Sequence, residues 1–179
     1  TEDEETLLFA YPFLTKNPVV YVTNIGDEDL ERGVNQYVSL VQEYAKKEGA
    51  RVIPLCAKIE EELSQLEDPT DFLEELGMQE PALDTLAKHS LKLLDLITFI
   101  TTGEMETKAW LIPNGISAKE AAGAIHSDIA KGFIKAEVIS AEKLLKIGSR
   151  LQARQQGEIA IVGKEYLVQD KDVMLFFHN

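Results

Sequence analysis

Long hydrophobic runs and basic residues near the start are both missing from this 179-residue sequence. No apolar run approaches the roughly 20 residues that a membrane-spanning helix needs. The first ten residues include four acidic side chains and no basic one, whereas a secretory signal peptide begins with positive charge. These absences exclude a signal peptide and a membrane-spanning helix, and they predict a cytoplasmic protein without a membrane partner.

Cysteine and histidine are also scarce. Cys56 is the single cysteine, so no internal disulfide can form. It follows the apolar stretch 52–55, which predicts a small buried residue rather than a nucleophile. The histidines, His89, His126 and His178, have no second histidine or carboxylate at metal-ligand spacing. We therefore expect neither a catalytic residue nor a metal site in this chain.

A phosphate-binding loop of the form GxxxxGK[ST] is absent as well. The nearest match begins at Gly157, but five residues separate it from Gly163, and Glu165 stands where a hydroxyl is required. We interpret this segment as a β-turn. Asp170 and Asp172 could together hold a cation, but no third ligand accompanies them, and a turn between strands explains them more simply.

Negative charge is concentrated in one half of the chain. The formal net charge is -13. Residues 1–90 contain 20 acidic and 7 basic side chains, whereas residues 91–179 contain 11 of each. The whole imbalance therefore belongs to the first half, which predicts two modules with different partners.

The first half has the order strand, helix, strand. Residues 18–23 form a β-branched and aromatic run, typical of a buried strand. Apolar residues then recur at helical spacing from Leu30 to Ala45, and Gly49 ends this helix. A second buried strand follows over residues 51–57, which completes a βαβ unit of a parallel sheet covered by helices. Three further helices are predicted over residues 60–66, 71–76 and 81–94.

The second half changes to short strands. Its predicted order begins strand, strand, helix, strand, in which one helix crosses a mixed sheet. This order is typical of a ubiquitin-like β-grasp. The predicted fold class is therefore α/β, with a parallel sheet first and a β-grasp second. Strands are expected at 96–101, 108–112, 133–140, 159–162, 166–169 and 173–177, and helices at 118–126 and 141–147.

Two loops in the first half carry the candidate chemistry. Residues 24–27 (Asn-Ile-Gly-Asp) follow the first buried strand, and residues 56–58 (Cys-Ala-Lys) follow the second. In nucleotide-binding α/β proteins such loops hold the base, one through side chains and the other through backbone amides. A capping Asn-Gly turn would explain the first loop without any ligand. The residue pattern alone leaves both interpretations open.

One long motif resembles a known family. Residues 121–138 reproduce the pattern AAGxIHxDxxKGFIxAEV, which is similar to the core of the TGS domain in the YchF subfamily of Obg-like P-loop NTPases. Residues 96–99, 102–103, 109–110, 166–170 and 172–173 resemble other strands and turns of that domain, whereas Lys171 replaces a turn glycine of the family. The resemblance implies that the fold is the terminal part of a P-loop NTPase sheet followed by a TGS domain.

The same resemblance extends to the two loops of the first half. It implies that the base-binding residues are Asn24, Ile25, Asp27, Cys56 and Ala57, with Asn24 and the Ile25 backbone as the main contacts. The family carries NxxE where ordinary GTPases carry NKxD, and this change accompanies a preference for ATP. Asp27 occupies the last position here, and a carboxylate can also accept hydrogen bonds from guanine. Both ATP and GTP therefore remain open as the nucleotide.

The resemblance also implies a domain organisation and a function. Residues 1–15 would end a helical insertion, residues 16–92 would end the nucleotide-binding domain, and residues 93–179 would form the TGS domain. The family's phosphate loop, Mg²⁺-binding segments and catalytic histidine would precede residue 1. We therefore expect the chain alone to be inactive and a full-length parent to be a ribosome-associated ATPase or GTPase. The TGS domain would contact the large ribosomal subunit or RNA.

A second hypothesis is a binding module that acts without nucleotide. In that case the TGS domain would grip RNA or a protein partner, with a basic face of Lys143, Lys146, Arg150 and Arg154. A surface neutralised by salt bridges is the simpler interpretation of these residues. TGS domains also occur in threonyl-tRNA synthetases and stringent-response enzymes, but nothing here resembles their catalytic parts.

Overall fold

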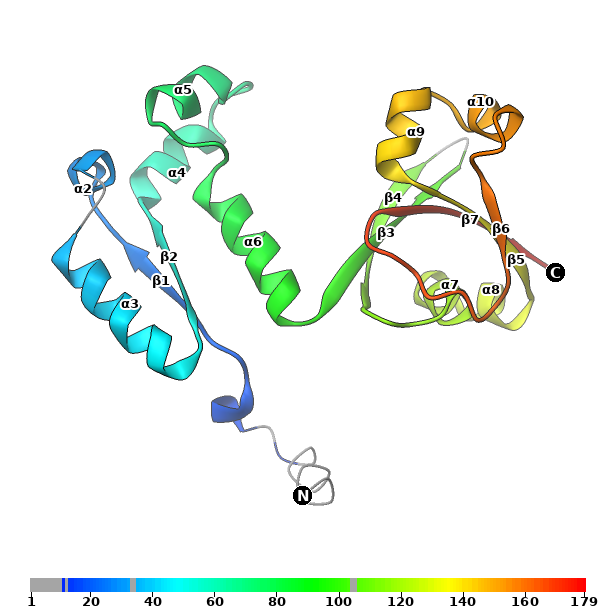
Figure 1. Cartoon of the computed structure of the whole chain (residues 1–179), viewed down its shortest axis with the longest axis horizontal. Helices are drawn as coiled ribbons and strands as arrows, with labels where there is room; N and C mark the ends of the chain where they lie inside the picture. Colours follow the sequence, from blue (N-terminus) through cyan, green and yellow to red (C-terminus); the bar gives the residue numbers. More distant parts are fainter. Residues whose placement is uncertain (1–10, 12, 33–34, 104–105) are drawn as a thin grey trace. The chain divides into compact units, whose positions relative to one another are not determined.

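A boundary between Leu94 and Asp95 divides the chain into two units, each with its own core (Figure 1). The computed structural model describes residues 11, 13–32, 35–103 and 106–179. The end of a helical insertion, expected over residues 1–15, falls mostly outside the described residues. No helix among the described residues is both long and apolar enough to cross a lipid bilayer.

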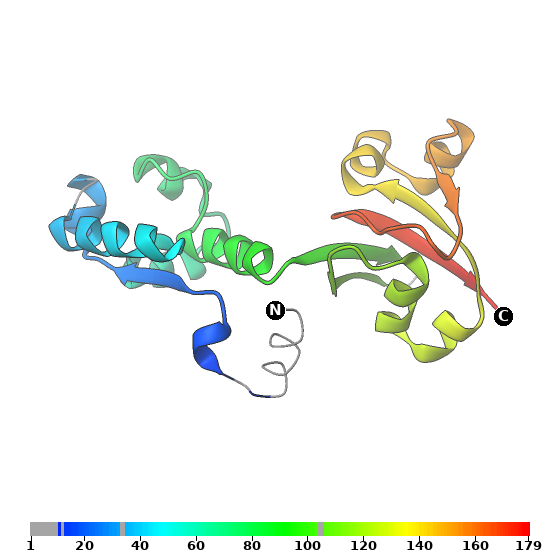
Figure 2. The same cartoon turned by 60° about the horizontal axis from the view of Figure 1, so that its bottom comes forward.

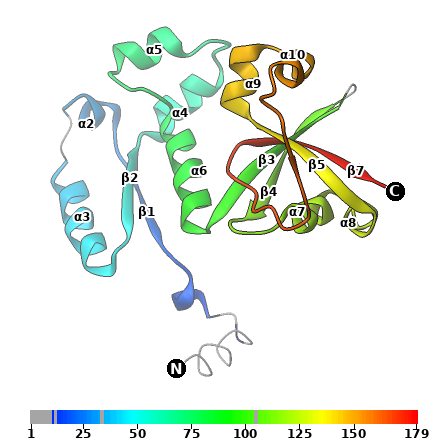
Figure 3. The ribbon, with the colours of Figure 1, turned by 45° about the vertical axis from the view of Figure 1, so that its right-hand side comes forward.

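A parallel pair of strands lies at the centre of the first unit. β1 (Val20–Asn24) pairs with β2 (Arg51–Leu55), in a register that places Asn24 beside Leu55. The connecting helix α3 (Gln36–Glu48) ends at Gly49, whose φ of 67° is readily adopted only by glycine. Both α3 and α6 pack against β2 (Figure 3). The unit also contains η1 (Leu14–Lys16), α2 (Asp27–Arg32), α4 (Ala57–Ser64), α5 (Thr70–Glu75) and α6 (Ala82–Leu93).

A buried carboxylate joins α4 to the start of α6. Glu60 is 6% exposed, and its two oxygens accept hydrogen bonds from the backbone N–H groups of Ala82 (2.8 Å) and Leu83 (3.2 Å). The first N–H groups of a helix have no partner within the helix, and Pro81 provides no side-chain cap. Glu60 therefore supplies the cap from 22 residues away.

The second unit is a β-grasp. Its five strands lie in the order β4-β3-β7-β5-β6, with β3 and β7 parallel and all other neighbours antiparallel. The first and last strands of the unit are thus neighbours inside the sheet, which is the topology expected from the sequence. The strands are β3 (Leu96–Thr102), β4 (Thr107–Pro113), β5 (Phe133–Ser140), β6 (Ala160–Val162) and β7 (Asp172–His178).

Helices cover both faces of this sheet (Figure 2). On one face α7 (Ala118–Ile125) and α8 (Ser127–Lys131) close the main core around Phe99, Ile112 and Met174. On the other face α9 (Ala141–Ile147) and α10 (Arg150–Gln155) close a smaller core around Ile139 and Val173. Residues that follow one another along a strand therefore point into two different cores.

Several secondary-structure predictions were wrong, including the strand predicted over residues 51–57, which ends at Leu55 because α4 begins at Ala57. The helical pattern from Leu30 to Ala45 belongs to two helices, because α2 ends at Arg32 and the Asn35 side chain caps α3 by accepting the Tyr37 N–H at 2.8 Å. Residues 166–169 form no strand, only one isolated bridge from Leu167. The short helices α8 and α10 had no apolar stripe to reveal them.

Gly132, the second glycine of the long sequence motif, lies where another part of the chain approaches closely. Its carbonyl accepts the Asn179 N–H at 3.1 Å. A Cβ added at Gly132 would overlap the Asn179 carbonyl oxygen and lie 3.1 Å from its amide nitrogen. Space, rather than backbone conformation, therefore requires glycine here, because φ is an ordinary -87°.

We expect Gly132→Ala to lower the free energy of unfolding by about 1–3 kcal/mol, the usual cost of forcing an atom into a packed site. Chemical denaturation measures this. Gly123→Ala is the matched control, since its new Cβ would meet the Ala130 Cβ at 3.5 Å, an ordinary contact. Equal stabilities of the two variants would contradict the packing explanation.

Candidate functional site

Two loops lie side by side where the paired strands of the first unit end. Because β1 and β2 are parallel and in register, the segments that follow Asn24 and Leu55 leave the same edge of the sheet. The Ile25 N–H donates to the Leu55 carbonyl at 2.9 Å, which extends the pairing by one residue. Figure 1 shows α2 and α4 starting at this same end of the strands.

A side-chain hydrogen bond joins the two loops. The Asn24 Oδ1 accepts the backbone N–H of Ala57 at 3.1 Å, across 33 residues of sequence. The N–H groups of Ile25 and Ala57 are therefore both occupied within the protein. The Asn24 carboxamide nitrogen makes no hydrogen bond to the described residues, so its two N–H groups can be offered to a ligand.

An ion pair also connects the loops. The Asp27 Oδ2 lies 2.9 Å from Lys58 Nζ, and the Asp27 Oδ1 accepts the Glu28 N–H at 3.0 Å. The hydrogen bond from Lys58, followed by the Glu28 N–H, lowers the pKa of Asp27, and the same ion pair raises the pKa of Lys58. Both oxygens of Asp27 are thus engaged inside the protein.

Cys56 contributes differently from the other candidate residues. Its side chain is 4% exposed and packs with Ile59, Leu63 and Leu73 in the core of the first unit. The sequence expectation of a small buried residue agrees with this position. Only the backbone of Cys56 is thus placed to face the two loops.

The structure adds residues that sequence reasoning missed. Lys58 belongs to the second loop but was not among the candidate base-binding residues, although its position directly after Ala57 could have indicated a partner for Asp27. A cavity of about 300 Å³ also opens on the α3 side of the first loop. Asp29 and Asn35 border it, joined by a 2.6 Å hydrogen bond from Asn35 Nδ2 to Asp29 Oδ2. Thr23 Oγ1, on the same cavity, is buried without a hydrogen-bond partner among the described residues.

No cluster of three or more metal-ligating side chains occurs in the part of the chain that the structure describes. Asp170 and Asp172, the cation candidates, instead hold the turn before β7. Asp170 Oδ1 accepts the Thr98 N–H at 2.9 Å, and Asp172 Oδ2 accepts the Tyr166 hydroxyl at 2.8 Å. Burial and this hydrogen bond raise the pKa of Tyr166 to about 12.

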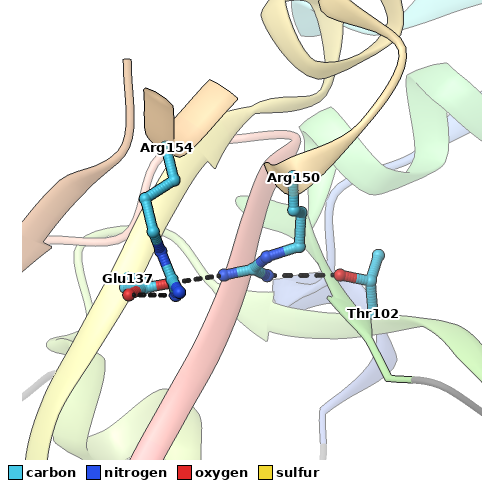
Figure 4. A network of polar contacts seen from close by, with 4 residues as sticks. All are labelled: Thr102, Glu137, Arg150 and Arg154. Atoms are coloured by element: carbon cyan, nitrogen blue, oxygen red, sulfur yellow. Dashed lines mark hydrogen bonds and ion pairs between the residues drawn. The ribbon is translucent and has the colours of Figure 1, made fainter. Parts of the chain in front are cut away.

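The four basic residues considered as a nucleic-acid face are ion-paired. Arg150 and Arg154 both bind the carboxylate of Glu137 (Figure 4). On the exposed surface, Lys143 pairs with Glu158 at 2.7 Å and Lys146 pairs with Glu142 at 2.6 Å. The simpler interpretation, a surface neutralised by salt bridges, holds for both lysines.

Comparison with known proteins identifies relatives along the whole chain. Residues 96–179 match the family model YchF-GTPase_C, described as a protein of unknown function (DUF933). The chain is 44% identical to the ribosome-binding ATPase YchF of Bacillus subtilis (strain 168), over 100% of this chain and 50% of that protein. It is 39% identical to the ribosome-binding ATPase YchF of Escherichia coli O157:H7, over 99% of this chain and 49% of that protein. The chain thus spans about half the length of the curated relatives it matches.

Solved structures agree with these relatives. The structure of the Schizosaccharomyces pombe YchF GTPase superposes with a TM-score of 0.87 at 26% identity, covering 99% of this chain and 48% of that one. A GTP-binding protein from Pyrococcus horikoshii OT3 superposes with a TM-score of 0.60 at 18% identity, covering 90% of this chain and 46% of that one, and supports the fold alone. The long motif, the β-grasp topology and the similarity over the whole of this chain all indicate the same family. The chain belongs to the YchF family.

Proposed function

We propose that this chain is part of a ribosome-associated, nucleotide-binding ATPase, located in the cytoplasm, whose first unit holds the base of the nucleotide. The relatives named as ribosome-binding ATPases support this activity. Since the chain spans half their length, the phosphate loop, the Mg²⁺ ligands and the catalytic group would come from residues outside it. The chain alone would then be inactive.

The observation that carries the proposal is the hydrogen bond from Ala57 to Asn24, which ties the two loops together at the carboxyl edge of a parallel sheet. With its oxygen fixed by Ala57, the Asn24 carboxamide can present its Nδ2–H groups in one direction. A purine offers ring-nitrogen acceptors to such donors. Asn24 would therefore be the main base contact, flanked by Ile25 on one loop and the Cys56–Ala57 backbone on the other.

The pairing of Asp27 favours adenine over guanine. A guanine-specific carboxylate must accept hydrogen bonds from the guanine N1–H and the 2-amino group. Here Lys58 and the Glu28 N–H already occupy both Asp27 oxygens. Guanine would therefore compete with Lys58 and the Glu28 N–H for the Asp27 oxygens, whereas adenine makes no such demand. We infer that ATP is the preferred nucleotide and that Asp27 acts mainly as the partner of Lys58.

Titration of the full-length protein with ATP and GTP tests this function. We expect ATP to bind at least tenfold more tightly than GTP. Lys58→Ala should narrow that preference, mainly by strengthening GTP binding, because it frees Asp27. Lys88→Ala is the matched control, since Lys88 pairs with Glu80 elsewhere in the same unit. Absence of binding to either nucleotide would overturn the proposal, and equal affinities in the unmodified protein would refute the role given to Asp27.

Asn24→Ala in the full-length protein should weaken ATP binding by about 1–3 kcal/mol, roughly 5- to 150-fold, because the base loses a hydrogen-bond partner in a desolvated site. Isothermal titration calorimetry measures the loss. The control Asn17→Ala changes an exposed asparagine outside the two loops and should bind ATP normally. Unchanged affinity of Asn24→Ala would remove Asn24 from the base site.

A nucleotide-independent binding module is the second candidate. The second unit favours it, because that unit has a complete β-grasp core of its own. Co-sedimentation with ribosomes distinguishes the two functions. If the module acts alone, this 179-residue chain should co-sediment with ribosomes without nucleotide. If nucleotide controls docking, only the full-length protein should do so, and its binding should change when ATP is added.

A further inference from the structure

Asn114 and Gly115 form the turn that follows β4. This is the single Asn-Gly pair in the sequence. In such a pair the backbone nitrogen of the second residue can attack the carboxamide of the first, because glycine has no side chain to block the approach. The product is a five-membered cyclic imide, which water opens to aspartate or isoaspartate. The turn therefore has a chemical reactivity that the proposed nucleotide binding does not use.

The attacking nitrogen is free in this turn. The Gly115 N–H donates no hydrogen bond to the described residues. Both residues of the pair are exposed, and no atom beyond the chain neighbours lies within 4 Å of the position that a Cβ on Gly115 would take. Gly115 has a φ of 83°, which glycine adopts without strain. Water and base can therefore reach this amide, and neither packing nor a hydrogen bond protects it.

Other asparagines of the chain lack this combination. Asn17 precedes Pro18, which has no backbone N–H and cannot form the imide in the same way. Asn24 precedes the β-branched Ile25, whose N–H is already bonded to β2. Asn35 caps α3, and both the oxygen and the nitrogen of its carboxamide are hydrogen-bonded. These three residues serve as internal controls for Asn114.

The Asn114 side chain also makes a contact that the reaction would destroy. Its Nδ2 donates to Asp95 Oδ1 at 3.1 Å, and its backbone N–H donates to the Asp95 carbonyl at 2.8 Å. Asp95 has a φ of 51°, a left-handed conformation that is uncommon in residues other than glycine. It is the first residue of the second unit and directly precedes β3. The two hydrogen bonds from Asn114 thus help to hold an uncommon backbone conformation where β3 begins.

We propose that Asn114 is a site of spontaneous deamidation and that its products loosen the start of β3. The Gly115 nitrogen loses its proton to base and bonds to Asn114 Cγ, the Cγ–Nδ2 bond breaks, and Nδ2 leaves as ammonia. Water then attacks one of the two imide carbonyls. Attack at Cγ gives aspartate, and attack at the main-chain carbonyl gives isoaspartate. In total one water is consumed, and one carboxylate and one ammonium ion are formed.

Both products remove the donor that faces Asp95. In aspartate, a carboxylate oxygen takes the place of Nδ2 beside Asp95 Oδ1, so an attractive contact becomes a repulsion between like charges. In isoaspartate, the main chain runs through Cγ, so the group that faced Asp95 becomes part of the backbone between β4 and α7. Either change should weaken the connection between Asn114 and Asp95.

Peptide mapping of the 179-residue chain tests the reaction. Trypsin cuts after Lys108 and Lys119, so residues 109–119 leave as one peptide. During incubation in mildly alkaline buffer, we expect aspartate and isoaspartate to accumulate in this peptide at least tenfold faster than in the peptides that contain Asn17, Asn24 or Asn35. Chromatography with mass spectrometry separates the three forms. A sample digested before incubation corrects for conversion during the digestion.

A pair of variants tests the consequence. Asn114→Asp reproduces one product, and it should lower the midpoint of thermal unfolding of the second unit, followed by Trp110 fluorescence, by roughly 4 °C. In a chain that already carries Asp95→Asn, the same change should lower the midpoint less than half as much, because an amide at position 95 can donate to the new carboxylate. Asn17→Asp is the matched control, since it adds the same charge at an exposed position of the first unit, and it should leave the midpoint unchanged.

Three results would overturn the proposal. The first is conversion of residues 109–119 no faster than that of the peptides with the other asparagines. The second is conversion more than tenfold slower in the folded chain than in the same chain unfolded in urea, which would show that the turn protects Asn114. The third is an equal effect of Asn114→Asp with and without Asp95→Asn, which would show that the contact with Asp95 does not hold the start of β3.

Discussion

Replacing Glu137 with alanine should lower the free energy of unfolding by about 3 kcal/mol. The Glu137 side chain is 8% exposed and accepts hydrogen bonds from two arginines, so its loss leaves the half-buried Arg150 guanidinium without a counter-charge. Breaking a buried ion pair from one side costs about 3–5 kcal/mol. The low end applies here, because Arg154 is 60% exposed and can return to water.

Denaturation followed by tryptophan fluorescence measures this loss, since Trp110 is the single tryptophan and lies in the second unit. The control is Glu142→Ala, which removes a carboxylate that pairs with Lys146 at the exposed surface. Exposed pairs contribute about 0–1 kcal/mol. A loss in Glu137→Ala no larger than in Glu142→Ala would show that the arginines do not depend on Glu137.

The same carboxylate should give the stability a dependence on acid pH. Burial alone would raise the pKa of Glu137, but the guanidiniums of Arg154 and Arg150 outweigh burial and lower that pKa below its ordinary 4.5. A lowered carboxyl pKa means that the stabilisation is complete above the unfolded value and is lost as pH falls toward the folded one. The stability difference between the unmodified chain and Glu137→Gln should therefore shrink below about pH 4.5. A difference that stays constant from pH 7 to pH 3 would contradict the ion pairing.

Phe99→Ala should have the largest effect on stability, about 3–5 kcal/mol. Phe99 is fully buried at the centre of the main core of the second unit. Its ring stacks on Trp110 at a centroid distance of 6.5 Å and meets the Phe176 ring edge-on at 6.0 Å. Alanine would forfeit these contacts and leave a cavity between strands that cannot close without moving the sheet.

Circular dichroism should follow this unfolding, because losing the Phe99 ring would itself change Trp110 fluorescence. Leu111→Ala is the control on the neighbouring strand. Its side chain is 56% exposed, and we expect a loss below about 1 kcal/mol, since large costs come from buried positions. Similar losses in the two variants would mean that the second unit is not organised around Phe99.

The spacing of apolar residues predicted most of the helices and strands, and it failed at the break between α2 and α3 and at residues 166–169. Strands such as β5 and helices such as α7 can be predicted from the spacing of their apolar residues and from their capping residues. The break between α2 and α3 was invisible, because the apolar spacing continues across it and only the Asn35 cap marks a new start. Residues 166–169 (Tyr-Leu-Val-Gln) form a short apolar run of the kind found in strands. Their backbone instead bonds to the start of α7, through Ala118 N–H to Tyr166 O at 2.7 Å, and to Ile116 through Val168 N–H at 3.1 Å.

The candidate base site was only partly accessible to sequence reasoning. The ends of two buried strands identified the loops at residues 24–27 and 56–58, since the carboxyl ends of parallel strands lie at the same edge of the sheet. Which atoms remain free for a ligand could not be read from those residues. That depended on Asn24 accepting from Ala57, and on Lys58 taking Asp27, which had been considered as a base contact.

The sequence by itself determined the α/β class, the β-grasp order, the acidic first half and the motif shared with the YchF family, because spacing, charge and local caps are encoded in neighbouring residues. Only the tertiary structure decided the partners of Asn24, Asp27 and Glu137. Apart from the Glu28 N–H beside Asp27, those partners lie 13 to 33 residues away in the chain. Their meeting depends on strand register and helix packing, which local patterns do not specify.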